Sequence, residues 1–300
     1  MVKVIAEPAN YWQGDHKLLH QAAYAAAAAG CSMFKVQLYD TGNMGKEWAD
    51  KRLFYKQSEL EVGSLSDIAK TVKTLGMELL ITISQIQLLD TALRFSSNIK
   101  IASGQFDNEL ACELMRSNKI KKLVISTGMM ETVIPDTPDR CGTLEHIRDF
   151  ALNSHIPEIV VMHCVSLYPP SNSEMNMDRI DGLREFFEDI PNVEIGYSDH
   201  AADNLPGLIA VAKGVKYVEI HMAIRGMFGP TSEIASTGEE LSTEILNFKK
   251  IETMLGNGQL KMQDRELPMK ERYSTRWKNR LIIIKGSVLP SGTVVPFERK

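Results

Sequence analysis

The sequence predicts a (β/α)8 TIM barrel followed by a short, truncated C-terminal β segment. Eight short apolar runs are each followed by a helical pattern, and this alternation is typical of a parallel sheet covered by helices. The runs are nearly continuously apolar, as expected for strands that are buried on both faces. Eight such units favour a closed barrel over a doubly wound open sheet, which we keep as the second interpretation.

The expected elements alternate in order along the chain. Each strand is a run of six or seven residues rich in Val, Ile and Leu, and the helices between the strands are amphipathic. The alanine run at 25–29 suits a helix that packs close to the sheet, because alanine is small and is the best helix former. The strands are expected at 2–7, 33–38, 77–83, 98–103, 122–127, 158–164, 193–198 and 216–221, and the helices at 16–29, 64–75, 87–95, 108–117, 143–153, 177–189, 203–213 and 239–255.

The composition indicates an ordinary globular protein with a small-molecule ligand. The net charge is -4 with both signs interspersed, which gives no long-range attraction for nucleic acid or an anionic membrane. The four cysteines are widely spaced and form no CxxC pair, so we expect reduced thiols. The N-terminus enters a strand without a signal peptide, and no apolar stretch approaches membrane-spanning length, so we expect a soluble cytoplasmic protein.

Polar residues end every predicted strand. In barrels of this kind the active site lies at the mouth where the strands end, so these side chains are expected to converge there. A single serine or threonine is more simply explained as a solvated loop residue, but the whole set is not. The set comprises Glu7, Lys35, Gln37, Thr82, Lys100, Ser103, Ser126, Thr127, His163, Ser166, Tyr168, Ser198, His200 and His221.

The cations and hydroxyl groups of this set point to an anionic ligand. Lys35 and Lys100 are donors suited to phosphate or carboxylate oxygens. The hydroxyl groups of Ser103, Ser126 and Ser198 add further donors, so we expect a doubly anionic ligand.

Two histidines, His200 and His221, end the neighbouring seventh and eighth strands. Their rings are able to face one divalent ion and to leave positions for water and substrate, which suits Mn²⁺ better than a closed structural zinc site. Mg²⁺ or Co²⁺ would also be compatible. The alternative is that each histidine is a hydrogen-bonded packing residue.

The order of motifs resembles that of the N-acetylneuraminate (sialic acid) synthase family of phosphoenolpyruvate-dependent nonulosonate synthases. The motifs "AEPANYWQGD", "FKVQ", "KIASG", "STGM", "HCVSLYP", "GYSDH" and "VEIH", then "GP" at 229–230, occur in the order seen in that family and span roughly residues 3–255. The resemblance implies a barrel enzyme that condenses phosphoenolpyruvate with the aldehyde form of an N-acyl hexosamine. The products would be a nine-carbon 2-keto acid and phosphate.

The resemblance also implies roles for individual residues. His200 and His221 match the family's metal-binding histidines, and Glu7 is the carboxylate expected to position the sugar or to relay a proton. Gln37 and Tyr168, together with Glu7, match positions that face the sugar. The positions that match the family's phosphoenolpyruvate site are Lys35, Thr82, Lys100, Ser103, Ser126, Ser166 and Ser198.

The acceptor side departs from the family pattern. Where the family reads Gly-x-Asn-His, this chain has the bulkier Ala9, Asn10, Tyr11 and Trp12, whose rings would lie against a sugar or simply pack in the loop. Thr231 stands where the family has a sugar-binding aspartate, and Ile220 replaces the usual cation before the histidine. We therefore expect an acceptor other than the common N-acetylmannosamine.

Three segments are expected along the chain: a barrel at 1–258, a basic linker at 259–280 and a partial antifreeze-like β-clip at 281–300. The resemblance implies a homodimer in which the complete module supplies an arginine to the partner's sugar site. With the module short, Arg276 or Arg280 would have to replace it, although both also suit a solvated linker. Two other functions stay open: an imine-forming aldolase that uses Lys100 or Lys35, and a degenerate barrel that only binds ligands.

Overall fold

The computed structural model describes residues 1–43, 52–132 and 142–278, and the side chains of 274–278 are excluded. Two compact units are present, Met1–Gly256 and Asn257–Lys300. The first is the barrel. The second contains α10 (Leu267–Lys278) within the region expected to be a linker, whereas the predicted β-clip at 281–300 and Arg280 lie outside the described residues.

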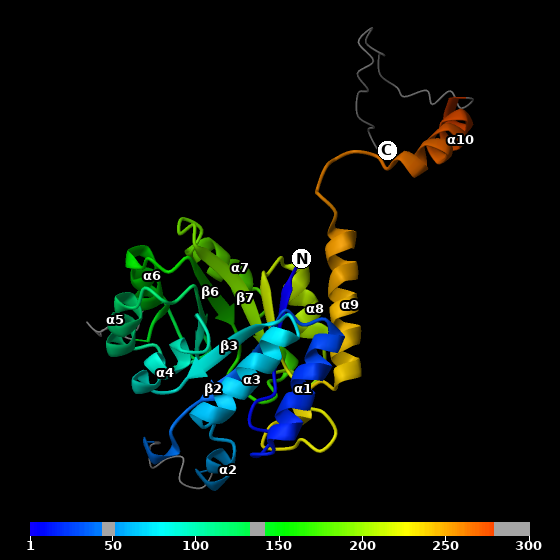
Figure 1. The fold of residues 1–300 in the computed structure, drawn as a ribbon. Coiled ribbons are helices and arrows are strands. Elements are labelled where there is room, and N and C mark those ends of the chain that lie inside the picture. Colours follow the sequence, from blue (N-terminus) through cyan, green and yellow to red (C-terminus); the bar gives the residue numbers. More distant parts are fainter. Residues whose placement is uncertain (44–51, 133–141, 279–300) are drawn as a thin grey trace. The chain divides into compact units, whose positions relative to one another are not determined.

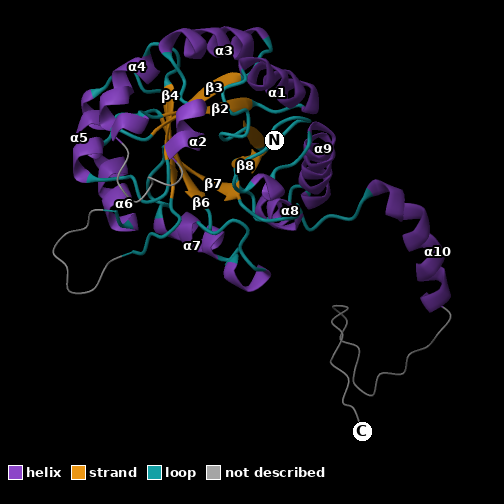
Figure 2. Ribbon diagram, turned by 90° about the horizontal axis from the view of Figure 1, so that it is seen from below, coloured by secondary structure: helices purple, strands orange, loops and turns teal. Residues whose placement is uncertain are grey.

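Eight parallel strands close into a barrel in chain order, with β8 paired to β1, which confirms the predicted fold. Figure 2 shows the strands at the centre of a ring of helices. The strand predicted at 33–38 matches β2 residue for residue, and each of the other strands differs from its predicted range at one end only, by one or two residues. The strands are β1 (Lys3–Glu7), β2 (Met33–Leu38), β3 (Glu78–Ile83), β4 (Asn98–Ile101), β5 (Lys122–Ser126), β6 (Glu158–His163), β7 (Val193–Asp199) and β8 (Tyr217–His221).

Helices follow each strand and cover the outside of the barrel (Figures 1 and 2). α1 packs against α9, so the first and last crossover helices lie side by side. The short helix α2, which the sequence pattern does not predict, lies at the mouth where the strands end. The barrel helices are α1 (His16–Ala29), α2 (Arg52–Gln57), α3 (Val62–Thr74), α4 (Leu89–Leu93), α5 (Asn108–Arg116), α6 (Leu144–Asn153), α7 (Arg179–Phe186), α8 (Leu205–Ala212) and α9 (Gly238–Leu255).

The barrel interior is a separate buried cluster of apolar side chains. Successive side chains of a strand point to opposite faces, so the residue two positions beyond an interior one also faces the interior. Leu80 is thus followed by Thr82, and Val124 by Ser126. The strands therefore fill the barrel with apolar residues and deliver polar ones to its mouth. The cluster consists of Ile5, Met33, Leu80, Val124, Val160, Met162 and Tyr217.

Two capped helices fix the loops at this mouth. The Asp15 side chain accepts from the backbone N–H of Lys17 at 2.9 Å and of Leu18 at 3.3 Å, which starts α1 directly after the first loop. Thr237 and Glu240 form a capping box that starts α9 after the last loop. None of the described helices is both long enough and apolar enough to cross a membrane.

Candidate active site

A cavity of ≈ 650 Å³ opens at the mouth where the strands end. It brings together side chains from β2, β3, β4, β5, β7 and β8, and Tyr55 of α2 also lines it. Of the twelve residues predicted to bind substrate or metal, eleven line this cavity. They are Lys35, Gln37, Thr82, Lys100, Ser103, Ser126, Ser166, Tyr168, Ser198, His200 and His221.

Glu7 is the predicted site residue that does not line the cavity. Its side chain is fully buried, and Oε1 accepts hydrogen bonds from Ala9 N at 2.7 Å and Gln37 Nε2 at 3.2 Å. Its other oxygen forms a salt bridge with Lys35. Glu7 therefore reaches a ligand only through the two residues that it holds, Gln37 and Lys35.

Glu219, which was not predicted from the sequence, joins the predicted anion-binding residues. It is 1% exposed, and its Oε1 accepts from Lys35 Nζ at 2.7 Å and Lys100 Nζ at 2.6 Å. Ser198 Oγ donates to the same oxygen at 3.1 Å. The strand alternation contained the signal, because Glu219 lies two residues before His221 and so faces the same side of β8.

Burial and ion pairing have opposite effects on the pKa values of Lys35 and Glu219 in this site. Burial lowers the pKa of Lys35 to about 7, although Glu219 opposes this shift. Burial would raise the pKa of Glu219, but the ammonium groups of Lys100 and Lys35 outweigh it and hold the pKa well below the usual range. Glu219 is thus a carboxylate. Glu7 and Glu219 together pair with Lys35 and Lys100.

The two histidines are held as neutral rings. Burial lowers the pKa of His200 to about 4 and that of His221 well below its usual value. His200 Nδ1 lies 2.6 Å from the carbonyl oxygen of Val165, so it must donate its proton there. His221 Nδ1 lies 3.1 Å from the hydroxyl of Tyr11. Each ring therefore keeps Nε2 for another partner.

The rings of His200 and His221 lie close together without a third side chain of the usual metal-binding types from the described part of the chain. The ring centroids of His200 and His221 lie 5.5 Å apart, and the Tyr168 ring packs on His200 at 4.2 Å. Across residues 1–43, 52–132 and 142–278, no group of three or more His, Cys, Asp or Glu is arranged to hold a metal ion. A metal here would have two protein ligands and open positions for water or substrate.

Gly128 lies against the hydroxyl groups of Ser103 and Ser166, two serines that line the cavity. The Gly128 N–H donates to Ser103 Oγ at 3.2 Å. A β-carbon at position 128 would lie 2.8 Å from Ser103 Oγ and nearer still to Ser166 Oγ. The absence of a side chain therefore leaves room where hydroxyl and amide groups converge.

Some polar residues at the strand ends point away from the cavity. The hydroxyl of Thr127 donates to the Met162 carbonyl at 3.0 Å, and His163 Nε2 lies 2.9 Å from the Met175 carbonyl. Tyr11 and Trp12 are 1% and 3% exposed and do not line the cavity, which favours packing in the loop over stacking on a sugar.

Besides Glu219, several residues that line the cavity were not predicted from the sequence. Tyr39 stacks edge-on against Tyr55, with ring centroids 5.7 Å apart. Tyr55 lies on α2, which has no clear sequence pattern, and Asn43 ends a 3-10 helix at Thr41–Asn43. The others lie in loops whose course the local sequence does not fix. The whole set comprises Tyr39, Asn43, Tyr55, Ser84, Gln85, Ala102, Gln105 and Met129.

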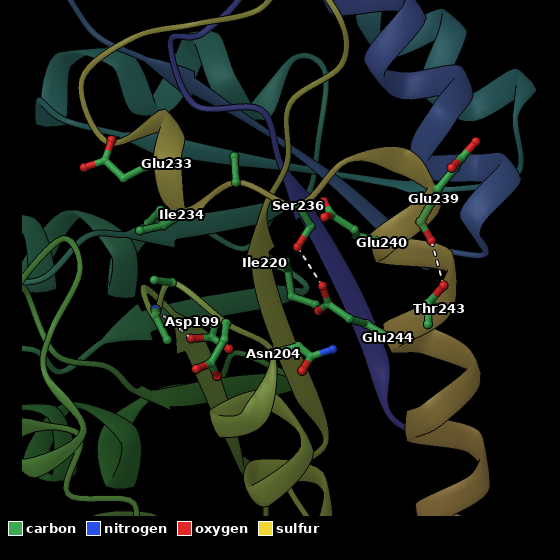
Figure 3. A pocket seen from close by; sticks show the side chains of 14 residues that line it. Asp199, Asn204, Ile220, Glu233, Ile234, Ser236, Glu239, Glu240, Thr243 and Glu244 are labelled. Carbon is green, nitrogen blue, oxygen red and sulfur yellow. Dashed lines mark hydrogen bonds between the residues drawn. The ribbon is translucent and has the colours of Figure 1, made fainter.

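A second cavity, of ≈ 570 Å³, lies outside the barrel beside the first turns of α8 and α9 (Figure 3). Ser236 donates to Glu244 at 2.6 Å across it, and Ile220 contributes to its wall. It contains none of the residues predicted to bind substrate or metal, so the cavity in the barrel mouth is the candidate active site. Its acidic residues are Asp199, Asp203, Glu233, Glu239, Glu240 and Glu244.

Residues 22–260 match the model of the NeuB family. The chain belongs to the NeuB family. Among the relatives, the N,N'-diacetyllegionaminic acid synthase of Legionella pneumophila is 25% identical over 300 residues, which cover 95% of this chain and 82% of that protein. The pseudaminic acid synthase of Campylobacter jejuni is 26% identical over 282 residues, with 89% and 78% covered.

A solved structure shares the fold of this NeuB-family chain. The N-acetylneuraminic acid (sialic acid) synthetase of Leptospira borgpetersenii, in complex with citrate, superposes with a TM-score of 0.75. The two are 22% identical, and the match covers 93% of each chain. The family resemblance predicted from the motifs is confirmed.

Proposed function

We propose that this protein condenses phosphoenolpyruvate with the open-chain aldehyde of an N-acylated hexosamine to give a nonulosonic acid and phosphate. The observation that carries the proposal is the convergence of Lys35, Lys100 and Ser198 in one cavity beside two neutral histidines. Membership of the NeuB family and the synthase names of the relatives support the reaction class.

The anionic substrate would lie against the lysines and the hydroxyl groups. The two ammonium groups are balanced by Glu7 and Glu219, so neutral donors must hold part of the substrate's charge. The hydroxyls of Ser103 and Ser166 supply such donors, and Gly128, which has no side chain, leaves room beside them. Glu219 favours the charged form of Lys35, whose burial favours the neutral form.

The histidine pair fits a divalent ion, for which we propose Mn²⁺, with Mg²⁺ or Co²⁺ as alternatives. His200 and His221 are neutral, and each has its Nδ1 engaged, which leaves the two Nε2 atoms as ligands. Two nitrogen ligands with open positions suit Mn²⁺ better than a closed zinc site. When bound, the ion would supply Lewis-acid polarisation of the aldehyde oxygen.

The reaction forms one carbon–carbon bond and breaks one carbon–oxygen bond. C3 of phosphoenolpyruvate attacks C1 of the aldehyde, water adds at C2, and phosphate leaves with its bridging oxygen. Lys35 and Lys100 hold the anion while charge moves from the enol to the acceptor oxygen. Gln37 and Tyr168 face the sugar, and Glu7 orients the Gln37 amide from behind.

Phosphate release tests the proposal. Phosphoenolpyruvate and Mn²⁺ are incubated with a panel of N-acetylated and diacetamido hexoses, with and without EDTA. Release that needs one sugar and stops with EDTA is the expected result, and it would refute a barrel that only binds ligands. No release with any sugar from a folded protein that binds phosphoenolpyruvate would count against the synthase proposal. The expected homodimer and cytoplasmic location stay predictions.

An imine-forming aldolase is the second candidate, because the pKa of Lys35 is lowered to about 7 and a neutral amine is a nucleophile. The salt bridges from Lys35 to Glu7 and Glu219 oppose this role, since they hold the ammonium form. Borohydride would trap substrate on a lysine in an aldolase and would leave a phosphoenolpyruvate-dependent synthase unlabelled.

A further inference from the structure

Two departures from the family pattern, Tyr11 and Thr231, meet at one of the proposed metal ligands. The Tyr11 hydroxyl lies 3.1 Å from His221 Nδ1, 3.1 Å from the Thr231 carbonyl oxygen and 3.2 Å from Thr231 Oγ1. Tyr11 is 1% exposed, so water does not compete freely for these contacts. The three residues come from the first loop, the last loop and the end of β8.

The chemistry of the three groups fixes the direction of the hydrogen bonds. A carbonyl oxygen only accepts, so the single hydroxyl proton of Tyr11 goes to Thr231 O. The Tyr11 oxygen is then an acceptor, and His221 must donate to it from Nδ1–H. If Tyr11 instead donated its proton to His221 Nδ1, a lone pair of the Tyr11 hydroxyl oxygen would face a lone pair of the Thr231 carbonyl oxygen. His221 therefore carries its proton on Nδ1 and presents the lone pair of Nε2.

The backbone at Thr231 adopts a conformation that its surroundings must hold in place. Its φ is 70°, in the left-handed region, which is a genuine outlier for a β-branched residue. Such strain persists only where the surrounding structure holds it. Here Gln13 Nε2 donates to Phe228 O at 2.7 Å and Phe228 N donates to Tyr11 O at 3.1 Å, so the first and last loops are tied together.

We propose that Tyr11 and Thr231 are a positioning pair that fixes His221 as the Nδ1–H tautomer and reserves its Nε2 for the metal. The proposal rests on the proposed function in one respect only, namely that the ligand of His221 Nε2 is a metal ion. It also places Thr231 in contact with Tyr11, so position 231 orients a metal ligand here, where the resembled family has a sugar-binding aspartate. His200 obtains the same tautomer from the Val165 carbonyl without a side-chain partner.

The tautomer is measured directly in the metal-free protein. The chain is labelled with ¹⁵N-histidine, and the ring nitrogens are observed by long-range ¹H–¹⁵N correlation spectroscopy, with His221 assigned by its loss in His221→Gln. The wild type is expected to show the Nδ1–H tautomer at His221. Tyr11→Phe, which removes the hydroxyl alone, is expected to give a mixture of the two tautomers.

Tyr217→Phe is the matched control, because it removes the hydroxyl of a buried tyrosine at the start of β8, where that hydroxyl hydrogen-bonds Glu158 and Lys3, away from His221. It should leave the His221 signals unchanged. An Nε2–H tautomer in the wild type overturns the proposal even if Tyr11→Phe does not fold, because that result needs no variant. A folded Tyr11→Phe protein that keeps a pure Nδ1–H tautomer overturns it as well.

Mn²⁺ titration followed by electron paramagnetic resonance separates this proposal from the proposed function. Tyr11→Phe is expected to weaken Mn²⁺ binding by about 10–100-fold, as is usual when the hydrogen-bond partner of a ligating histidine is lost. Tyr217→Phe should bind Mn²⁺ like the wild type. One outcome is that Tyr11→Phe loses the pure Nδ1–H tautomer, but neither the wild type nor either variant binds Mn²⁺. This result would support the positioning pair and refute the metal assignment. Equal Mn²⁺ affinity in the wild type and Tyr11→Phe would overturn the pair's role toward the metal.

Discussion

Replacing Glu219 by glutamine removes the negative charge that both active-site lysines share. Lys35 Nζ and Lys100 Nζ lie 2.7 Å and 2.6 Å from Glu219 Oε1, and the side chain is 1% exposed. Glutamine keeps the size but replaces a charged acceptor with an amide. Removing one partner of a buried ion pair costs about 3–5 kcal/mol. Because Glu7 still pairs with Lys35, chiefly Lys100 loses its carboxylate, and we expect the lower end, about 3 kcal/mol.

The expected loss of stability is measurable by calorimetry or by fluorescence during heating. For a barrel of this size, about 1 kcal/mol shifts Tm by about 2–4 °C, so Glu219→Gln should melt roughly 6–12 °C below the wild type. Saturating phosphoenolpyruvate supplies negative charge to the same lysines. It should therefore raise the Tm of Glu219→Gln by more than that of the wild type.

Glu78→Gln is the control for this experiment. Glu78 pairs with the buried Lys122 at the other mouth, but its side chain is 46% exposed and Glu158 also lies 3.5 Å from that lysine. We expect a loss of less than about 1 kcal/mol there. A Glu219→Gln protein that melts with the wild type, or equal stabilisation of both proteins by phosphoenolpyruvate, would refute the view that Glu219 is the counterion of the substrate site.

Three further predictions concern binding and turnover. Gly128→Ala should weaken phosphoenolpyruvate binding by at least about 100-fold, because the new methyl group meets the hydroxyls of Ser103 and Ser166. Its circular dichroism spectrum should be unchanged. Wild-type affinity in calorimetry would contradict the role of these two hydroxyls as substrate donors. His200→Ala or His221→Ala should abolish turnover and Mn²⁺ binding while the melting transition remains cooperative, and a fully active variant would remove the metal assignment. Binding of phosphoenolpyruvate should weaken as the pH rises above about 7, because the Lys35 pKa is lowered to about 7 and the neutral amine carries no charge to pair with the anion. Calorimetry at pH 8 in two buffers should show proton uptake on binding that Lys35→Arg removes, and identical heats in both buffers would refute this titration.

The regular part of the fold follows from local patterns in the sequence. The barrel strands were predicted within one or two residues, because a buried parallel strand is a short apolar run and a crossover helix has a different period. The polar ends of those strands gave eleven of the residues that line the cavity. Side-chain alternation explains this success, since Lys35 and Gln37, or Ser198 and His200, lie two apart and share a face.

Contacts between distant segments were decided only by the tertiary structure. Lys35, Lys100 and Ser198 meet at Glu219 because barrel closure brings β2, β4 and β7 to β8, across as many as 184 residues of chain. The burial of Glu7 and the contact of Tyr11 with His221 have the same origin. The sequence by itself determined which residue types reach the barrel mouth, because strand period and strand ends are local properties. Which of them pair, and therefore which are charged, neutral or oriented, depends on burial and on through-space distances that exist only in the closed barrel.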